Sequence, residues 1–253
     1  MTAGEKTRIK SVGRISEIVQ LLQEEGPLGI TEIADHTGLP TSTVHDYVGS
    51  LYEMEYVVKS EKKYDLGLRF LDHGMSAREN RPISTVGQSS IEQLAEATGE
   101  AVWIVVEEHG KAVYVNRALG DRAIETARIG TRSDLHCLAS GKAILAHLSD
   151  DRVDEIINQH GLSTRTDRTV GTRETLYDEL EAVRKQGYAT NEGEAVEGAR
   201  AVGTPVLVGD DIAGAVSVSG PANRITDDQL EDEILAELLR ATNELEVRLG
   251  RHL

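Results

Sequence analysis

The 253-residue chain has one cysteine, Cys137, and few aromatic side chains, which make up 4% of the sequence. A single thiol excludes an intramolecular disulfide framework and a zinc site built from cysteines alone. No apolar run reaches the length of a membrane span, and the segment from Met1 to Lys10 has no apolar signal core. The sequence therefore predicts a cytoplasmic protein without a membrane partner, long enough for two domains.

Residues 29–66 have the order of a winged helix-turn-helix, which is a short helix, a tight turn, a second helix and a small hairpin. Gly38 and Pro40 fit the turn, because glycine accepts a left-handed helix end and proline cannot continue a helix. We expect Thr41 to cap the second helix by accepting hydrogen bonds from its free amide groups. A helical hairpin in an unrelated small domain is the alternative reading.

The second helix is expected from about Thr41 to Met54 and carries the residues that would face DNA. Val44, Val48 and Leu51 share one face at positions i, i+4 and i+7, so the other positions project outward. In a winged helix-turn-helix this helix enters the major groove of double-stranded DNA, and lysines in the wing reach phosphate. The predicted DNA-binding residues are Thr41, Ser42, Thr43, His45 and Asp46 on the helix, and Lys59, Lys62 and Lys63 in the wing.

Positive charge is scarce for a DNA-binding protein, because 43 acidic residues outnumber 27 basic ones and the net charge is −16. The low share of lysine, 8 against 19 arginines, favours a salt-adapted organism in which ions screen the repulsion between carboxylates. Other local basic residues are Lys6, Arg8, Lys10 and Arg14, which either assist DNA binding or form a solvated tail. An N-terminal module that binds protein is the alternative.

A linker helix is expected from Leu66 to about Asn80, and Pro82 would end it. The residues spaced for packing on this helix are Leu68, Leu71 and Met75. We therefore place a domain boundary near residue 81, with residues 1–80 forming the winged helix-turn-helix domain and its linker helix. Because one such module would contact only a few base pairs, we expect this helix to join two copies in a homodimer.

Residues 81–253 mix strand-like runs with separate helical segments. An expected strand covers Ala123–Ile129, and an expected helix covers Cys137–Leu148. Such a mixture predicts an α+β fold around a mostly antiparallel sheet.

Signatures of an enzyme are weak. Ser140-Gly141-Lys142 lacks the glycine that a phosphate-binding loop needs five residues before Gly141, because His136 stands there. His136 and Cys137 are adjacent, and neighbouring residues rarely meet as base and nucleophile or join a metal site without further ligands. Cys137 is more simply a small buried hydrophobic residue. We therefore expect no catalytic residue, no metal and no cofactor.

A small-molecule pocket is better supported. Ser217 and Ser219 are two residues apart on an expected strand, so their hydroxyl groups share a face, although solvent-facing serines would show the same alternation. Ala139 and Ser140 begin an expected helix, whose free amide groups favour an anion. Together these features predict a carboxylate ligand.

The chain resembles the IclR family of transcription regulators over nearly its whole length. The matching segments are Leu39–His45, Tyr64–Gly67, Leu135–Cys137, Ser140–Ala143, Gly187–Ala189, Glu194, Pro205–Val206, Ser217–Pro221 and Arg224. The resemblance implies a winged helix-turn-helix joined to an effector-binding domain similar to GAF and profilin folds. It also implies homodimers or dimers of dimers, and binding of small organic acids or aromatic metabolites.

Carried over from the family, the effector pocket would include Ala139, Ser140, Asn191, Ala201, Ser217 and Ser219. Asn191 stands where aspartate is frequent in the family, and Ala201 where cysteine is frequent, which changes the charge and the size of the pocket. Asp46 replaces a frequent arginine, although aspartate can accept a hydrogen bond from cytosine. The expected function is a ligand-responsive, sequence-specific regulator of catabolic genes that senses an organic or sugar acid. The alternatives are a sensor or scaffold that binds protein, and an enzyme.

Overall fold

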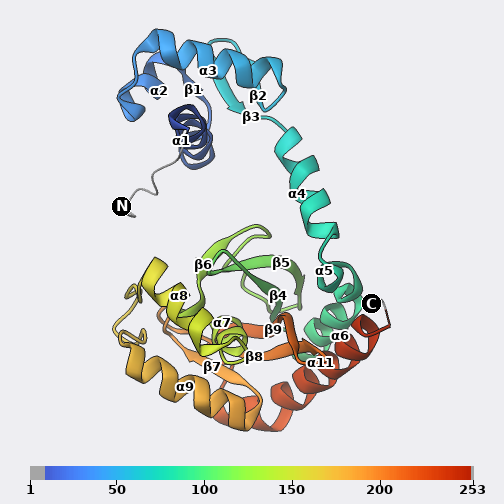
Figure 1. Cartoon of the computed structure of the whole chain (residues 1–253). Helices are drawn as coiled ribbons and strands as arrows, with labels where there is room; N and C mark the ends of the chain where they lie inside the picture. The colour runs from blue at the N-terminus through green and yellow to red at the C-terminus, as the bar shows by residue number, and fades with distance from the viewer. Residues whose placement is uncertain (1–8, 252–253) are drawn as a thin grey trace. The chain divides into compact units, whose positions relative to one another are not determined.

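The computed structural model describes residues 9–251, apart from the side chains of residues 231 and 232, so Lys6 and Arg8 lie outside the described range. Contacts between residues divide the chain into two compact units, Met1–Ala77 and Arg78–Leu253 (Figure 1). The N-terminal unit has one hydrophobic core and the C-terminal unit has two. No helix within residues 9–251 is both long and apolar enough to cross a membrane.

The N-terminal unit combines three helices with a small antiparallel sheet of order β1-β3-β2. Its elements are α1 (Lys10–Glu25), β1 (Leu28–Gly29), α2 (Ile30–Thr37), α3 (Thr41–Glu53), β2 (Val57–Ser60) and β3 (Lys63–Leu66). Val44, Val48 and Leu51 of α3 are buried in its core, as their spacing predicts. The predicted order of helix, turn, helix and wing is thus present, with β2 and β3 as the wing.

The turn between α2 and α3 uses Gly38 in the left-handed region, with φ at 67°, and the Gly38 N–H donates to the Ala34 carbonyl at 2.9 Å. The prediction that Thr41 caps α3 is wrong. Pro40 occupies the capping position and Thr41 is the first helical residue, so no side chain accepts from the free amide groups. The rigid backbone of Pro40 sets the entry to α3 in place of a side-chain cap.

Helix α4 (Arg69–Glu79) begins in the N-terminal unit and ends in the C-terminal unit. Its first turns are tied to Tyr56, whose ring centroid lies 5.0 Å from that of Phe70 and whose hydroxyl lies 3.0 Å from His73 Nε2. No residue of α4 is buried, and Leu71 is 59% exposed. The apolar side chains expected to pack along this helix are therefore uncovered within the single chain.

The C-terminal unit is built on a six-stranded antiparallel sheet of order β6-β5-β4-β9-β8-β7. The strands are β4 (Ala101–Glu108), β5 (Lys111–Leu119), β6 (Arg132–Asp134), β7 (Ala189–Glu192), β8 (Ala199–Val208) and β9 (Asp211–Pro221). The helices that precede the sheet are α5 (Pro82–Val86) and α6 (Gln88–Thr98). Those that follow β6 are α7 (Ala139–Leu145), α8 (Asp150–His160), α9 (Arg173–Gln186), α10 (Asp227–Gln229) and α11 (Leu235–Leu249).

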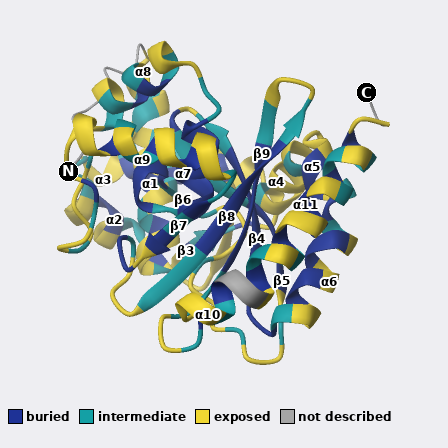
Figure 2. Ribbon diagram, turned by 90° about the horizontal axis from the view of Figure 1, so that it is seen from below, coloured by how far each residue is buried: buried dark blue, intermediate teal, exposed yellow. Residues whose placement is uncertain are grey.

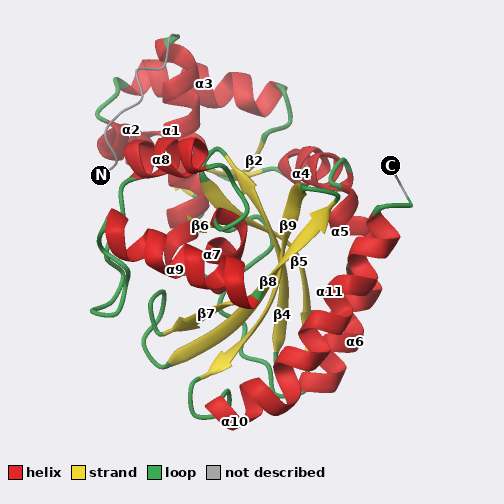
Figure 3. Ribbon diagram, turned by 60° about the horizontal axis from the view of Figure 1, so that its bottom comes forward, coloured by secondary structure: helices red, strands yellow, loops and turns green. Residues whose placement is uncertain are grey.

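Helices cover both faces of this sheet (Figure 3). Helices α6 and α11 lie on one face over a core that includes Val102, Ile104 and Val218, and their buried sides turn toward the strands (Figure 2). Helices α7, α8 and α9 lie on the other face over a core that includes Trp103 and Leu180. Successive side chains of a strand point to opposite faces of the sheet, so neighbouring residues such as Val102 and Trp103 belong to different cores.

Two segments differ from expectation. Ala123–Ile129 is a loop and not a strand, because Tyr114 of β5 already pairs with Thr131 and Gly130 through backbone hydrogen bonds of 3.1 and 2.8 Å. The edge of β5 is thereby occupied by the chain that leads into β6. The expected helix at Cys137–Leu148 is also shorter, because a 3₁₀ turn at Leu135–Cys137 precedes α7.

Gly141 fixes the contact between this 3₁₀ turn and α7. A Cβ atom at Gly141 would lie 2.0 Å from the Leu135 carbonyl oxygen, which is closer than any side chain tolerates. The glycine of Ser140-Gly141-Lys142 therefore serves close backbone packing.

Lys142 is buried in α7 and forms an ion pair with the buried Glu194, at 2.8 and 2.9 Å from its two carboxylate oxygens. It also lies 2.7 Å from Glu179 of α9. Burial raises the pKa of the Glu194 carboxyl group, although the charge of Lys142 opposes this shift. The pair thus joins α7 to the segment after β7 at the cost of burying both charges.

We expect the replacement Lys142→Met to lower the free energy of unfolding at neutral pH by about 3–5 kcal/mol, because Glu194 is left buried without its cation. Loss of the cation raises the pKa of Glu194 further. Folding is then penalised above that pKa, and stability should recover as the pH falls through it and the carboxylate takes up a proton. Urea unfolding at neutral and mildly acidic pH measures both effects.

The matched control is Lys185→Met, which removes an exposed lysine paired with Glu181 on the surface. Its effect should stay below about 1 kcal/mol at either pH. Equal losses in the two variants would show that the buried pair contributes no more than a surface pair.

Candidate functional site

Helix α3 presents a polar face on the N-terminal unit. Of the predicted residues, Thr41, Ser42, His45 and Asp46 are exposed and Thr43 is half-buried. His45 Nδ1 lies 3.9 Å from Asp46 Oδ1. Because α3 contains no lysine or arginine, its face offers hydrogen bonds to base edges and no cation for phosphate.

The wing supplies the positive charge that α3 lacks. Lys59, Lys62 and Lys63 are all exposed on the β2–β3 hairpin. Lys59 Nζ lies 5.1 Å from the centre of the Tyr64 ring, and Lys63 Nζ lies 3.7 Å from Glu32. Such exposed contacts are weak, so these lysines stay available to phosphate.

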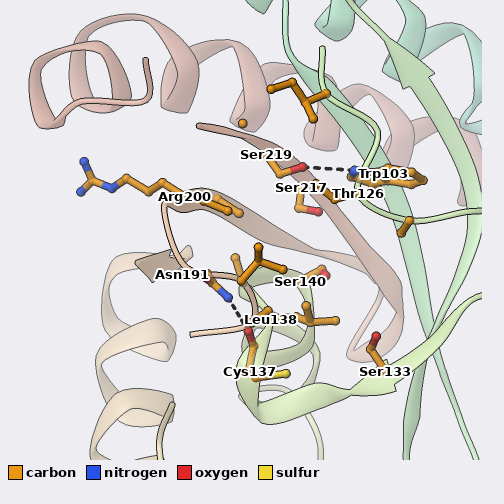
Figure 4. A pocket seen from close by; sticks show the side chains of 18 of the residues that line it. Trp103, Thr126, Ser133, Cys137, Leu138, Ser140, Asn191, Arg200, Ser217 and Ser219 are labelled. Carbon is orange, nitrogen blue, oxygen red and sulfur yellow. Dashed lines mark hydrogen bonds between the residues drawn. The ribbon is translucent and has the colours of Figure 1, made fainter. Parts of the chain in front are cut away.

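A cavity of about 360 Å³ lies in the C-terminal unit between the start of α7 and strands β8 and β9 (Figure 4). The six residues predicted for the effector pocket, Ala139, Ser140, Asn191, Ala201, Ser217 and Ser219, all line this cavity. The structure therefore brings together residues that are separated by up to 80 positions in the sequence. Loop residues such as Ile124 and Val196 line the same cavity with exposed apolar side chains.

Two largely buried serines present hydroxyl groups to the cavity that have no hydrogen-bond partner among the described residues. Ser140 and Ser217 are 3% and 5% exposed, and no hydrogen bond joins either hydroxyl to another residue within the described part of the chain. Neither oxygen is sealed from the cavity, since both residues line it. Each hydroxyl group can therefore donate one hydrogen bond to a ligand in the cavity and accept others.

Ser219 differs because the Trp103 indole N–H donates to its hydroxyl oxygen at 3.1 Å (Figure 4). Accepting this bond polarises the hydroxyl group and strengthens it as a donor toward the cavity. Trp103 in turn meets Tyr114 edge-to-face, with ring centroids 5.1 Å apart, and both rings line the cavity. No sequence pattern predicted this aromatic wall.

The phenol group of Tyr114 stays neutral at physiological pH, because burial raises its pKa to about 12. The position of Trp103 in the cavity depends on which strands pair. Trp103 lies opposite Ser217 in the β4–β9 register. The pairing of strands more than 100 residues apart does not follow from local patterns.

Asn191 has its amide group engaged within the protein. Its Nδ2 donates to the Cys137 carbonyl, and its Oδ1 accepts from the backbone N–H groups of Gly193 and Glu194 at 3.0 and 3.1 Å. An aspartate here would place a carboxylate oxygen against the Cys137 carbonyl. Asn191 therefore fixes the cavity wall by donating to the Cys137 carbonyl, and it adds no charge to the cavity.

Two arginines on the cavity lining were also missed. Arg200 is engaged by Glu192 and Asp227 at 2.8 and 2.6 Å. Arg165 is half-exposed and meets Asp134 at 3.2 Å through one nitrogen. The remaining N–H groups of the Arg165 guanidinium can donate to a ligand. Arg200 also has one buried donor, Nε, without a partner among the described residues.

Cys137 and His136 do not form a nucleophile and base. The Cys137 thiol donates to the Asp134 carbonyl at 3.2 Å, and burial raises the pKa of Cys137 to about 11. His136 Nε2 lies 3.1 Å from the Ser163 carbonyl oxygen, and burial lowers the pKa of its imidazole. The thiol therefore stays protonated and unreactive. Within the described range, no cluster of side chains suits a metal ion.

Two family matches cover most of the chain. Residues 11–61 match the IclR helix-turn-helix domain, and residues 75–247 match the bacterial transcriptional regulator IclR C-terminal domain. The chain is 31% identical over 252 residues to the "Probable HTH-type transcriptional regulator ArcR" of Halobacterium salinarum, covering 97% of this chain and 96% of that protein. It is 29% identical to the HTH-type transcriptional regulator KdgR of Escherichia coli, over 96% of this chain and 94% of that protein.

Solved structures agree with this assignment. The Thermotoga maritima IclR structure has a TM-score of 0.77 at 27% identity, covering 95% of this chain and 97% of that one. An IclR homologue from Microbacterium hydrocarbonoxydans, complexed with 4-hydroxybenzoate, shares the fold with a TM-score of 0.79 at 20% identity, over 96% of this chain and 100% of that one. The predicted α+β class with its winged helix-turn-helix is confirmed, as is the prediction that the protein is not an enzyme. The chain is a member of the IclR family of transcription regulators.

Proposed function

We propose that this protein is a ligand-responsive regulator that binds an operator through α3 and the wing and an organic acid in the cavity. The observation that carries the proposal is that the hydroxyl groups of Ser140 and Ser217, on largely buried residues, line a cavity with an aromatic wall and have no partner within the described residues. The regulated genes would serve the breakdown of that acid. Among the relatives, the acetate operon repressor of Salmonella typhimurium supports this assignment by its name.

The cavity offers mostly donors to a ligand. Ser140, Ser217 and the polarised Ser219 offer hydroxyl protons, and Arg165 adds a positive charge. The amide groups at the start of α7 contribute less than expected, because Gly203 packs against the Ser140 amide; a Cβ atom at Gly203 would lie 2.8 Å from it. We therefore assign the carboxylate of the ligand to the hydroxyl groups and to Arg165.

The aromatic wall beside these donors favours a flat, apolar body. Trp103 and Tyr114 present ring surfaces, and Leu138 and Ile124 add aliphatic ones. A sugar acid would leave several hydroxyl groups without partners against this wall, which costs free energy. Of the two expected ligand classes, the organic acid with an aromatic ring fits the cavity better. The complex of the Microbacterium homologue with 4-hydroxybenzoate supports this choice.

We expect the double replacement of Ser217 and Ser219 by alanine to weaken binding of an aromatic acid roughly a hundredfold, because two hydrogen bonds to a charged group are lost. Trp103 is the only tryptophan of the chain, so its fluorescence reports occupancy of the cavity. Titration with benzoate, 4-hydroxybenzoate and gluconate, followed by calorimetry, measures the effect.

The control is Thr164→Ala, which removes an exposed hydroxyl group outside the cavity and should leave binding unchanged. Equal affinity of wild type and double variant for the best acid would mean that the hydroxyl groups do not hold the ligand. Stronger binding of gluconate than of the aromatic acids would reverse the proposed ligand class.

For the operator, we expect Ser42→Ala or His45→Ala to cost roughly 1–3 kcal/mol on the specific sequence and to relax specificity at one position. Lys62→Ala should weaken binding to all sequences alike and reduce the dependence on salt, with Lys185→Ala as the control. Gel-shift titrations with DNA upstream of the gene of this protein, and with random DNA, measure both. If the wild-type protein binds neither the upstream DNA nor the random DNA, the alternative in which the N-terminal unit binds protein is favoured.

We also propose that α4 joins two copies in a homodimer, because Leu71 and Met75 are exposed beside a DNA-binding unit that alone spans a half-site. Leu71→Glu should shift the dimer to monomer at micromolar concentration, since it places a charge in an apolar interface. The exposed Asp72 beside it supports a matched control, Asp72→Gln, which should stay dimeric. Light scattering that shows wild type as a monomer would refute the assembly.

A further inference from the structure

Three consecutive residues of β5 connect the cavity to the end of α4. Tyr114 lines the cavity and contacts Trp103. The next residue, Val115, accepts a hydrogen bond from Arg78 Nε at 2.6 Å. Asn116 then donates from its side chain to the Ser84 carbonyl at 2.7 Å. The wall of the cavity and the attachment of α4 are thus neighbours along one strand.

A bulge in the sheet makes this arrangement possible. The β4–β5 register shifts between Ile104, which pairs with Asn116, and Val105, which pairs with Tyr114. Val115 is left without a partner on β4, so its carbonyl group is free to accept from Arg78. Bulges bend a strand and redirect its groups, and they are points where a sheet changes shape at low cost.

The C-terminal end of α4 is held tightly at this point. Ser84 Oγ lies 2.6 Å from the Arg78 carbonyl oxygen and 2.8 Å from that of Arg81, so its proton is shared between them. Ser84 and Asn116 are 1% and 2% exposed. A buried set of hydrogen bonds with each group satisfied has a narrow range of geometries, so a shift of β5 moves the end of α4 with it.

Helix α4 carries such a movement toward the N-terminal unit. It is continuous from Arg69 to Glu79, and its first turns are tied to Tyr56 by Phe70 and His73. A helix of this length is rigid compared with a loop, so rotation of its last turn reaches its first turn.

We propose that Arg78 and Asn116 are positioning residues that transmit occupancy of the cavity from Tyr114, through the bulge at Val115, to α4 and the DNA-binding unit. This inference rests on the proposed function, because it requires that the cavity binds an effector. The ligand displaces the Tyr114 ring, the bulge changes shape, and the bond from Val115 to Arg78 redirects the helix. A tenfold change in operator affinity corresponds to about 1.4 kcal/mol of coupling.

The test compares Arg78→Met with Arg81→Met in the full chain. Both replacements remove a guanidinium group at sites three residues apart, but the Arg81 side chain pairs with Glu108 and does not contact Val115. The probe is whichever of benzoate, 4-hydroxybenzoate or gluconate changes Trp103 fluorescence most. Operator affinity is measured by fluorescence anisotropy with and without saturating probe.

In wild type and Arg81→Met we expect the probe to change operator affinity about tenfold. In Arg78→Met the change should fall below about twofold, while probe affinity stays within about threefold of wild type. Asn116→Asp, which removes the donor to Ser84, should behave like Arg78→Met and gives a second variant if the first folds poorly.

A full response in both variants would overturn the role of Arg78 and Asn116 and leave the proposed function intact. Loss of probe binding in both would also overturn it, because these residues would then support the cavity itself. If wild type binds none of the probes, or binds one without any change in operator affinity, the proposed function fails and this inference fails with it.

Discussion

The buried ion pair between Lys142 and Glu194 holds together the two elements that enclose the cavity. Lys142 belongs to α7, and Glu194 lies in the loop after β7. The backbone of Glu194 is fixed as well, because its N–H donates to Asn191 and its carbonyl accepts from Thr169 at 2.7 Å. Gly141 and Gly203 then allow the backbone of α7 to approach the turn before it and β8. The cavity is what remains between these fixed contacts, so its shape depends on a charge pair that is not part of its lining.

The sequence alone predicted the elements whose patterns involve residues close together in the chain. Gly38 and Pro40 in the turn, and the spacing of Val44, Val48 and Leu51, predict α2 and α3 because helices and turns depend on near neighbours. Ser217 and Ser219 share a face for the same reason. Trp103, Tyr114 and Arg165 reach the cavity only through strand pairing and a distant loop, so no local pattern marks them. The resemblance to the family, and not periodicity, brought in Asn191 and Ala201. The strand expected at Ala123–Ile129 failed because an apolar run does not show which edge is free to pair with it.

The acidic composition is compatible with DNA binding because the positive charge of the N-terminal unit is concentrated outside α3. Helix α3 carries polar side chains without lysine or arginine, and the cations gather on the wing. Most of the excess negative charge belongs to the C-terminal part of the sequence, because residues 81–253 carry −12 of the net charge of −16. A protein with few phosphate contacts loses less affinity as salt rises, because fewer counterions are released on binding.

Glu61 at the tip of the wing has a left-handed backbone, with φ at 55°, and brings a carboxylate to the group of lysines. Glycine would relieve a backbone strain of about 1 kcal/mol and remove the charge, whereas lysine would reverse the charge. Codons for both residues differ from a glutamate codon by a single nucleotide. If the wing lysines contact phosphate as proposed, a single nucleotide change at the wing tip can raise DNA affinity without altering the proposed base contacts of α3.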